Sequence, residues 1–217
     1  MGMEPNMRAI PKTIHHIWLG GQPIPGELLY YRYTWMNHHR DWNFILWTEE
    51  NLPIHQFINE EEYQQAEHVV LKKDIAQYEI LNLYGGVYTD LDFECYKNIE
   101  PLMEDVTAFA GAELCNVIGM AIFACTSHHK LIKRLIRNIP QSIKENKGRP
   151  INEITGPVFV TKNINWNELA VYPDKLLFPS KFPNDPGPDR HDLFPDAYAI
   201  HHWYGVRPDG WVHNYDK

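Results

Sequence analysis

The sequence predicts an α/β protein whose mainly parallel central sheet is flanked by helices. Strand-like apolar runs alternate with helix-like segments along the first two thirds of the chain, a pattern typical of parallel sheets. A length of 217 residues suits one hydrophobic core, and no run of apolar residues is long enough to span a bilayer. We therefore expect one domain over residues 1–217, with a proline-rich tail or lid at about 172–217.

The first elements read as strand, helix and strand. Residues 12–21 (KTIHHIWLGG) form a β-rich apolar run that ends at two glycines. Residues 28–39 (LLYYRYTWMNHH) repeat large side chains at helical spacing, and residues 41–48 (DWNFILWT) resemble a buried strand.

Two helices come next. Asn59 and Glu62 have the spacing of a capping box and predict that a helix begins there. A second helix is expected from about 71 to 84, with Gly85 as its left-handed terminator. The segments that follow predict three strands and a basic helix: 87–92 (VYTDLD), 108–114 (AFAGAEL), 119–126 (GMAIFACT) and 130–137 (KLIKRLIR).

The chain changes character from Tyr172 onward. Prolines are frequent there, which disfavours a regular helix or a central strand. Residues 198–211 (YAIHHWYGVRPDGW) contain too many aromatic and histidine side chains for a disordered linker. We expect an ordered tail or lid.

Charge and cysteine content restrict the partners and the compartment. A net charge of −8 has the wrong sign for a nucleic-acid surface. Three cysteines without CxxC spacing predict reduced thiols, and the N-terminus lacks the apolar core of a secretory signal, so we expect a cytoplasmic protein. The basic run 130–137 reads as an amphipathic surface helix and leaves open a peripheral contact with the inner membrane face.

The segment 87–92 carries the strongest chemical signal. Side chains alternate along a strand, so Tyr88, Asp90 and Asp92 should point to one side. Two close carboxylates repel one another and lose hydration, which a divalent cation would offset. Carboxylates suit Mn²⁺ or Mg²⁺ and leave coordination positions for substrate phosphates, as in a nucleotide-diphosphate site at the carboxyl ends of strands.

Several segments, in order, resemble the DxD glycosyltransferases of the sugar-binding-region family, which includes yeast initiating mannosyltransferases and bacterial capsule and lipopolysaccharide enzymes. They are IPKTIHHIWLGG, ILWTEEN, LKKDIAQYEILNLYGGVYTDLD, ITGP and YAIHHWYG with a later Trp. Large clostridial glucosylating toxins look like distant relatives. The likeness extends from near Ile10 to Trp211. Its most specific part is residues 71–92, in which a helix is followed by two glycines, a strand and the DxD motif.

This resemblance implies a single GT-A catalytic domain that binds Mn²⁺ or Mg²⁺ and a nucleotide-sugar donor. A UDP-sugar is favoured and GDP-mannose is the alternative. The sugar would pass to a saccharide or lipid-linked acceptor with retention of configuration, in surface polysaccharide or glycan synthesis.

The resemblance also implies a metal and leaving-group site. Asp92 is the candidate direct ligand, with Asp90 beside it, and His201 is favoured over His202 as the third ligand. Trp211 resembles the terminal Trp that donates its indole N–H to the leaving diphosphate, although the family's preceding Ser is missing here.

The resemblance also implies which residues contact the substrate. Trp18 matches an aromatic that stacks on the donor base, with a core role equally open, and Asp74 matches a residue that bonds ribose or sugar hydroxyls. Lys73 beside it reads as a solvated helix charge. Gln77 stands where the family usually has Arg, so it could bond a hydroxyl but could not neutralise a phosphate.

Weaker matches complete the set of substrate-binding candidates. Asn116 lies where such enzymes place a polar residue under the sugar, and Tyr88 and Gly86 belong to the DxD block. Residues 155–157 (TGP) match a loop on the acceptor side. Glu113 would be available as a base if the enzyme inverts configuration, although a structural role is the simpler interpretation.

Three other interpretations remain. A DxD after a strand also occurs in haloacid-dehalogenase phosphatases, but those carry it on the first strand. Four His-His pairs suggest zinc, yet none has the HExxH or CxxC spacing of a zinc site. A sugar-nucleotide-binding protein that has lost turnover is compatible with Gln77 and the altered tail.

Overall fold

The computed structural model describes residues 9–114, 117–181 and 184–206. Within these residues, a central sheet has the strand order β2-β1-β3-β6-β5-β7, and β6 alone runs against the other five strands. The expectation of a mainly parallel sheet is therefore confirmed. The strands of this sheet are β1 Thr13–Ile17, β2 Asn43–Trp47, β3 Gly86–Thr89, β5 Ala108–Leu114, β6 Val117–Cys125 and β7 Ala170–Tyr172.

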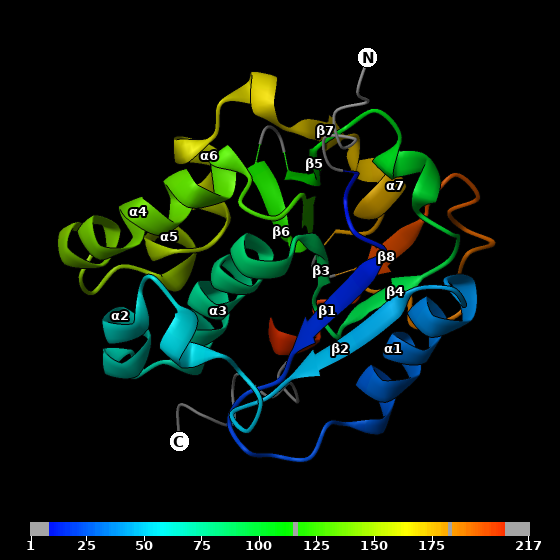
Figure 1. The fold of residues 1–217 in the computed structure, drawn as a ribbon. Helices are drawn as coiled ribbons and strands as arrows, with labels where there is room; N and C mark the ends of the chain where they lie inside the picture. Colours follow the sequence, from blue (N-terminus) through cyan, green and yellow to red (C-terminus); the bar gives the residue numbers. More distant parts are fainter. Residues whose placement is uncertain (1–8, 115–116, 182–183, 207–217) are drawn as a thin grey trace.

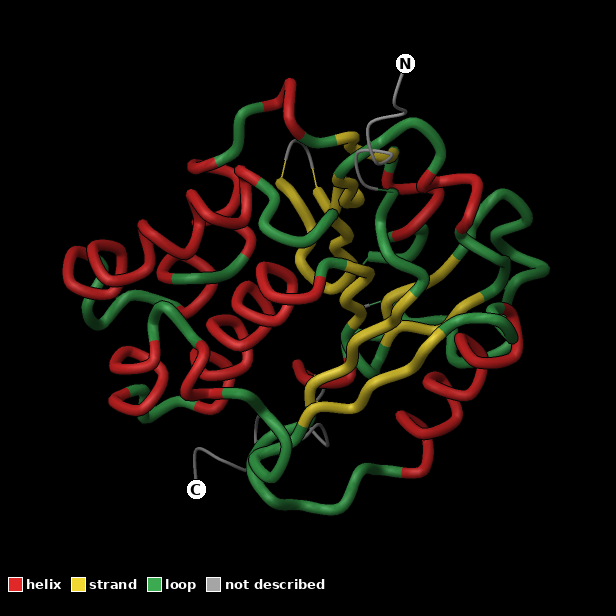
Figure 2. The backbone as a smooth tube through the Cα atoms, viewed as in Figure 1, coloured by secondary structure: helices red, strands yellow, loops and turns green. Residues whose placement is uncertain are grey.

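Helices cover both faces of the sheet, as the ribbon and tube views show (Figures 1 and 2). On one side lie α2 to α6, and on the other lie α1, α7 and a second sheet of two strands. The helices are α1 Gly26–His38, α2 Glu60–Gln65, α3 Val69–Tyr84, α4 Lys130–Glu145, α5 Ile151–Ile154, α6 Pro157–Asn163 and α7 Asp174–Leu177, and the second sheet pairs β4 Phe93–Cys95 with β8 Ala199–His201. Short 3₁₀ helices are Ile54–Gln56, Glu100–Met103, Trp166–Glu168 and Tyr204–Val206.

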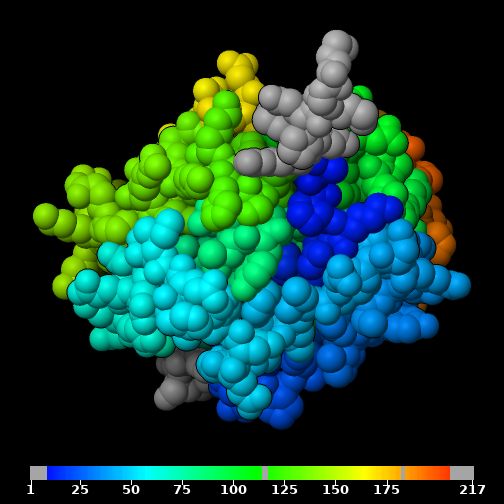
Figure 3. Space-filling view, viewed as in Figure 1, coloured from blue at the N-terminus to red at the C-terminus, as the bar shows by residue number. Residues whose placement is uncertain are grey.

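Strand alternation creates two cores, one on each face of the sheet. Tyr88 and Phe123 pack with α3 and α4, whereas Val87 and Ile122 pack with α1, β4 and α7. In the space-filling view, the dark blue N-terminal segment is visible between the cyan and green segments on one side and the lighter blue segment that contains α1 on the other (Figure 3). Burial on both faces explains why the strands read as continuous apolar runs.

The glycine pair performs two separate tasks. Gly85 ends α3 as predicted, and its N–H donates to the Leu81 carbonyl. Its φ of 63° is positive, but its ψ of −157° differs from that of the left-handed helical terminator that the sequence predicted. Gly86 begins β3 and lies against the backbone of β1, where a Cβ would be 2.7 Å from the Thr13 carbonyl oxygen. The pair therefore lets the chain pass directly from a helix into a buried parallel strand.

The expected strand 87–92 is interrupted. β3 ends at Thr89, Asp90 to Asp92 form a turn, and β4 begins at Phe93. The chain leaves the central sheet here because Leu91 is buried against Leu28 and other side chains of α1. The two aspartates therefore lie at a bend between two sheets.

Two further expectations need correction. α2 begins after Asn59 as predicted, but no side-chain cap forms, because the Asn59 amide donates to the Ile136 carbonyl instead. Among its described residues the tail contains the short helix α7 and the strand β8, and β8 lies outside the central sheet in agreement with the proline content. Two expected thiols, Cys95 and Cys125, are free and buried.

The basic helix forms as α4, from Lys130 to Glu145, with its apolar side chains buried. Lys130 and Arg134 both form ion pairs with Glu168, so part of the positive charge of this helix is neutralised within the protein. No helix among the described residues is both long and apolar enough to cross a bilayer.

Candidate active site

A cavity of about 440 Å³ lies beyond the carboxyl ends of β1 and β3. Trp18 follows β1 and Asp90 follows β3, and both line this cavity. This is the edge at which open α/β sheets bind ligands, as the sequence predicted. Other lining residues come from α3, the DxD turn, β5, β6 and the C-terminal segment.

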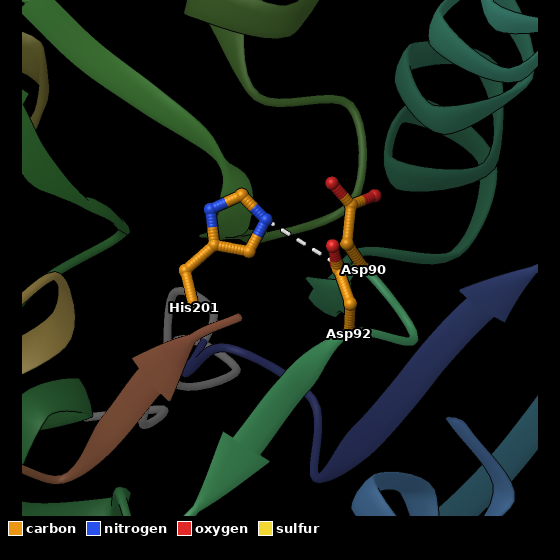
Figure 4. A group of neighbouring side chains, drawn as sticks. All are labelled: Asp90, Asp92 and His201. Atoms are coloured by element: carbon orange, nitrogen blue, oxygen red, sulfur yellow. Dashed lines mark ion pairs between the residues drawn. The ribbon is translucent and has the colours of Figure 1, made fainter. Parts of the chain in front are cut away.

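Asp90, Asp92 and His201 come together on the cavity wall. Each offers one ligand atom, and these atoms all lie within 4.8 Å of one another. Figure 4 shows the imidazole entering from β8 while the carboxylates approach from the turn before β4. Strand pairing produces this approach, because Phe93 is in register with His201 across β4 and β8.

Asp92 is held as a carboxylate by two donors. Its Oδ1 lies 3.2 Å from the Nε2 of His201, and its Oδ2 accepts the backbone N–H of Tyr204 at 2.8 Å. Burial opposes ionisation of Asp92, but these interactions outweigh it and lower the pKa of Asp92 to about 2. Burial likewise opposes the charge of His201, yet its pKa is raised because Asp92 stabilises the imidazolium.

The two neighbouring histidines have different environments. His201 lines the cavity, whereas His202 is buried with Nδ1 2.8 Å from Asp185 and Nε2 3.0 Å from Glu94. The His202 ring also stacks on Tyr31, with ring centroids 4.2 Å apart. His201 is therefore the histidine that the structure places at the aspartate pair, while His202 joins α1 to the C-terminal segment.

Lys73 is an internal charge, which corrects the expectation of a solvated one. Its side chain is 16% exposed, and its Nζ lies 3.2 Å from both the Asp74 Oδ1 and the Asp90 Oδ1. Burial opposes the ammonium charge, but Asp90, Tyr88 and Asp74 together raise the pKa of Lys73 well above 10.5. The sequence contains no signal for this contact, because the DxD turn that approaches α3 depends on the tertiary fold.

Asp74 lines the cavity from α3, as expected of a substrate-binding candidate. Its Oδ2 accepts a 2.8 Å hydrogen bond from the Thr155 hydroxyl, and both residues are buried. Burial raises the pKa of Asp74. Thr155 belongs to the predicted acceptor-side loop, whose Gly156 and Pro157 also line the cavity.

Three other candidates lie behind the cavity wall. Gln77 is fully buried and donates to the Met120 carbonyl at 3.0 Å, and Gly86 packs against β1. The Tyr88 hydroxyl donates to Asp90. None of these three is among the lining residues that the structure describes. The geometry therefore does not favour the direct substrate contacts that the resemblance implies for them. The reason is that α3 directs the Gln77 side chain and β3 directs the Tyr88 ring into the core, whereas Gly86 has no side chain.

Trp18 combines the two roles that the sequence left open. It lines the cavity but is only 8% exposed, and it packs with Leu28, Tyr31 and Leu91. Its indole Nε1 donates to the Gln22 carbonyl at 2.6 Å. One part of the ring therefore belongs to the core while another part faces the cavity.

Sequence reasoning did not assign site roles to three other lining residues, His68, Asn152 and Trp203. Trp203 follows the histidine pair with a φ of 56°, and its ring lies 4.1 Å from the His201 ring, centroid to centroid. The aromatic run 198–211 signalled this region but not the individual residue. The candidates Asn116 and Trp211 lie outside the described residues.

The Asp-Asp-His group fits a divalent metal such as Mn²⁺ or Mg²⁺. Two carboxylates supply hard oxygen ligands, and an imidazole nitrogen completes a set that Mn²⁺ accepts. The His201 Nδ1 is buried without a hydrogen-bond partner, so the ring is oriented mainly by its Nε2 contact with Asp92 and by stacking. A cation would also relieve the repulsion between the two carboxylates.

Known proteins that are similar to this chain are glycosyltransferases. Residues 25–108 match the family described as "Glycosyltransferase sugar-binding region containing DXD motif". These residues are therefore similar to the sugar-binding region of the DXD glycosyltransferases. The matched region contains Asp74, Asp90 and Asp92 and ends at the start of β5.

The similarity to glycosyltransferases extends beyond residues 25–108 and covers most of the chain. Inositol phosphoceramide mannosyltransferase 3 of Schizosaccharomyces pombe is 26% identical over 223 aligned residues, which cover 90% of this chain. The chain spans 60% of the length of that relative.

Solved structures show the same fold at low sequence identity. PaToxG glycosyltransferase has a TM-score of 0.58 at 16% identity, covering 71% of this chain and 68% of its own. The catalytic domain of alpha-toxin from Clostridium novyi has a TM-score of 0.50 at 12% identity, covering 64% of this chain and 59% of its own. The fold is the GT-A glycosyltransferase fold, as the sequence predicted.

Proposed function

We propose that this chain is a metal-dependent glycosyltransferase that moves a hexosyl group from a nucleoside-diphosphate sugar to a hydroxyl group of a saccharide or lipid-linked acceptor. The observation that carries the proposal is the meeting of Asp90, Asp92 and His201 on the wall of a cavity of about 440 Å³. That volume lies in the range of small-molecule sites. The family match and the fold favour transfer over the phosphatase alternative.

Asp92 and His201 would hold the metal, with Asp90 beside them. A bound divalent metal would supply positive charge where negative charge develops on the leaving diphosphate. The chain keeps Asp92 ionised through the Tyr204 N–H and keeps the imidazole of His201 directed at Asp92. Trp18 would bind the donor base on its exposed part, and Asp74 would accept hydrogen bonds from sugar hydroxyls.

Transfer with retention of the anomeric configuration does not require a protein base. If the acceptor hydroxyl attacks on the face from which the diphosphate leaves, a leaving phosphate oxygen can take the hydroxyl proton and no protein base is needed. Glu113 lines the cavity, and burial raises its pKa, so it would be the base of an inverting enzyme. The anomeric configuration of the product, read by NMR, distinguishes the two stereochemical courses.

The donor and the setting follow from the comparisons by analogy. The mannosyltransferase name of the fission-yeast relative supports GDP-mannose, while the wider resemblance favours UDP-sugars. An acceptor with a polyol or lipid-linked headgroup is consistent with that relative's name. We propose action in glycan or surface polysaccharide synthesis, on the cytoplasmic side, with peripheral membrane contact at the acceptor.

The test is donor consumption with a panel of UDP- and GDP-sugars and Mn²⁺, with and without a chelator and with simple acceptors such as methyl mannoside and inositol. We expect metal-dependent consumption of one donor, reduced at least a hundredfold by Asp92→Asn. Asp196→Asn is the matched control, because Asp196 is an exposed carboxylate that does not line the cavity. Donor binding without consumption under all conditions would identify a sugar-nucleotide-binding protein that has lost turnover.

A further inference from the structure

The cavity has an unequal distribution of charge. Its described lining includes four carboxyl side chains, namely Asp74, Asp90, Asp92 and Glu113. Among the same described lining residues, Lys73 is the one lysine, and no arginine is present. A site for an anionic diphosphate therefore depends on how this single permanent cation is used.

Lys73 is fixed between two carboxylates. Its Nζ lies 3.2 Å from Asp90 and 3.2 Å from Asp74, and the Asp74 carboxylate is itself fixed by the Thr155 hydroxyl. An ammonium is a compact charge with three donors, so one Lys can bridge two acceptors. The bridge joins α3 and the loop at Thr155 to the DxD turn.

At Asp90 the bridge has a specific consequence. The Asp90 Oδ1 accepts from both the Lys73 ammonium and the Tyr88 hydroxyl. For Oδ2, the described part of the chain provides no hydrogen-bond donor. One oxygen of Asp90 is therefore used to orient the carboxylate, and the other is left for a ligand.

We propose that Lys73 is a positioning residue that orients Asp90, with help from Tyr88, so that its second oxygen serves the metal and donor site. The inference rests on the proposed function in assuming that a metal binds beside Asp90. In the absence of Lys73, the buried Asp74 and the partly exposed Asp90 would repel one another, and the Asp90 carboxylate would rotate away from Asp74. The contact at 3.2 Å to each carboxylate is what prevents this rotation.

Positioning and simple electrostatics predict opposite results for one variant. If Lys73 merely adds positive charge, Lys73→Met should increase the affinity for a cation. If Lys73 positions Asp90, the same variant should weaken Mn²⁺ binding by about tenfold, the size of effect usual when a residue that orients a metal ligand is removed. Met retains most of the apolar stem and so limits the packing change.

The experiment measures Mn²⁺ binding alone, by calorimetry and by the electron paramagnetic resonance signal of free Mn²⁺. Lys72→Met is the matched control, because Lys72 is the preceding residue and lies over the Tyr63 ring, 5.6 Å from its centroid, outside the cavity lining. We expect its Mn²⁺ affinity to stay within twofold of the wild-type value. A loss of stability alone would lower the melting temperature of Lys73→Met without changing the Mn²⁺ affinity of the folded protein.

Tyr88→Phe removes the other donor to the same Asp90 oxygen and keeps the ring. We expect it to weaken Mn²⁺ binding in the same direction but less, and it carries the test if Lys73→Met does not fold. Unchanged or tighter Mn²⁺ binding in folded Lys73→Met, or unchanged binding in Tyr88→Phe where Lys73→Met does not fold, overturns the inference. Absence of Mn²⁺ binding by the wild-type protein would instead refute the metal dependence in the proposed function.

Discussion

Replacing Gly85 by Ala should disrupt the junction that delivers the DxD turn. Gly85 has φ 63° and ψ −157°, a region essentially restricted to glycine. A Cβ there would lie 2.5 Å from the Ser127 amide nitrogen and 2.9 Å from the Cys125 carbonyl oxygen, both backbone atoms that cannot swing aside. We expect a loss of about 2–6 kcal/mol in the free energy of unfolding, combining backbone strain of about 1–3 kcal/mol with overpacking of about 1–3 kcal/mol.

Gly148→Ala is the matched control. Gly148 also has a positive φ, of 81°, but a Cβ there would meet nothing within 4 Å. It should cost about 1 kcal/mol, because only the left-handed conformation is penalised and the unfolded chain also loses freedom. Urea unfolding followed by tryptophan fluorescence measures both variants. Equal losses in the two variants, or a loss below about 1 kcal/mol for Gly85→Ala, would refute the steric reasoning.

Two further measurements examine single contacts of the site. In metal-free protein the pKa of His201 lies above 6.5, so the charged pair with Asp92 stabilises the fold below pH 6.5 and this contribution fades as pH rises through the raised pKa. Asp92→Asn should lower that pKa, as measured by NMR of the imidazole, and an unchanged value would contradict the pairing. Thr155→Val removes the donor to buried Asp74 with little change of shape, so the free energy of unfolding should fall by about 1.5–3 kcal/mol, whereas an unchanged urea midpoint would show that the bond contributes little.

Local sequence signals predicted the fold well because they coincide with local structure. Gly85 had to end a helix, and the apolar runs of β1 and β3 had to be covered on both sides. The break at Leu91 was not predictable, because alternating polar and apolar residues allow a strand to continue as readily as to turn. Burial of Leu91 against α1, a tertiary event, decides between them.

The site was predicted in part for the same reason. Asp90 and Asp92 are close in sequence, so their proximity needs little tertiary information. The resemblance points to Asp74, which lines the same cavity. The sequence predicts a solvated Lys73 because the position of this residue on α3 gives no indication that the DxD turn approaches it. The resemblance predicts a substrate contact for Gln77, yet the register of α3 directs its side chain at the Met120 carbonyl. The missing information in both cases is which side of α3 faces the sheet.

The pairing of β4 with β8 has a consequence for the order in which the protein folds. His202 and Glu94, which meet beside this pairing, are 108 positions apart in the chain. Closing so long a loop costs entropy before any contact is gained, so contacts of this range form late. During synthesis, Asp90 and Asp92 on the DxD turn would be made long before His201 on β8. The proposed activity would therefore require the chain to be synthesised and folded as far as β8.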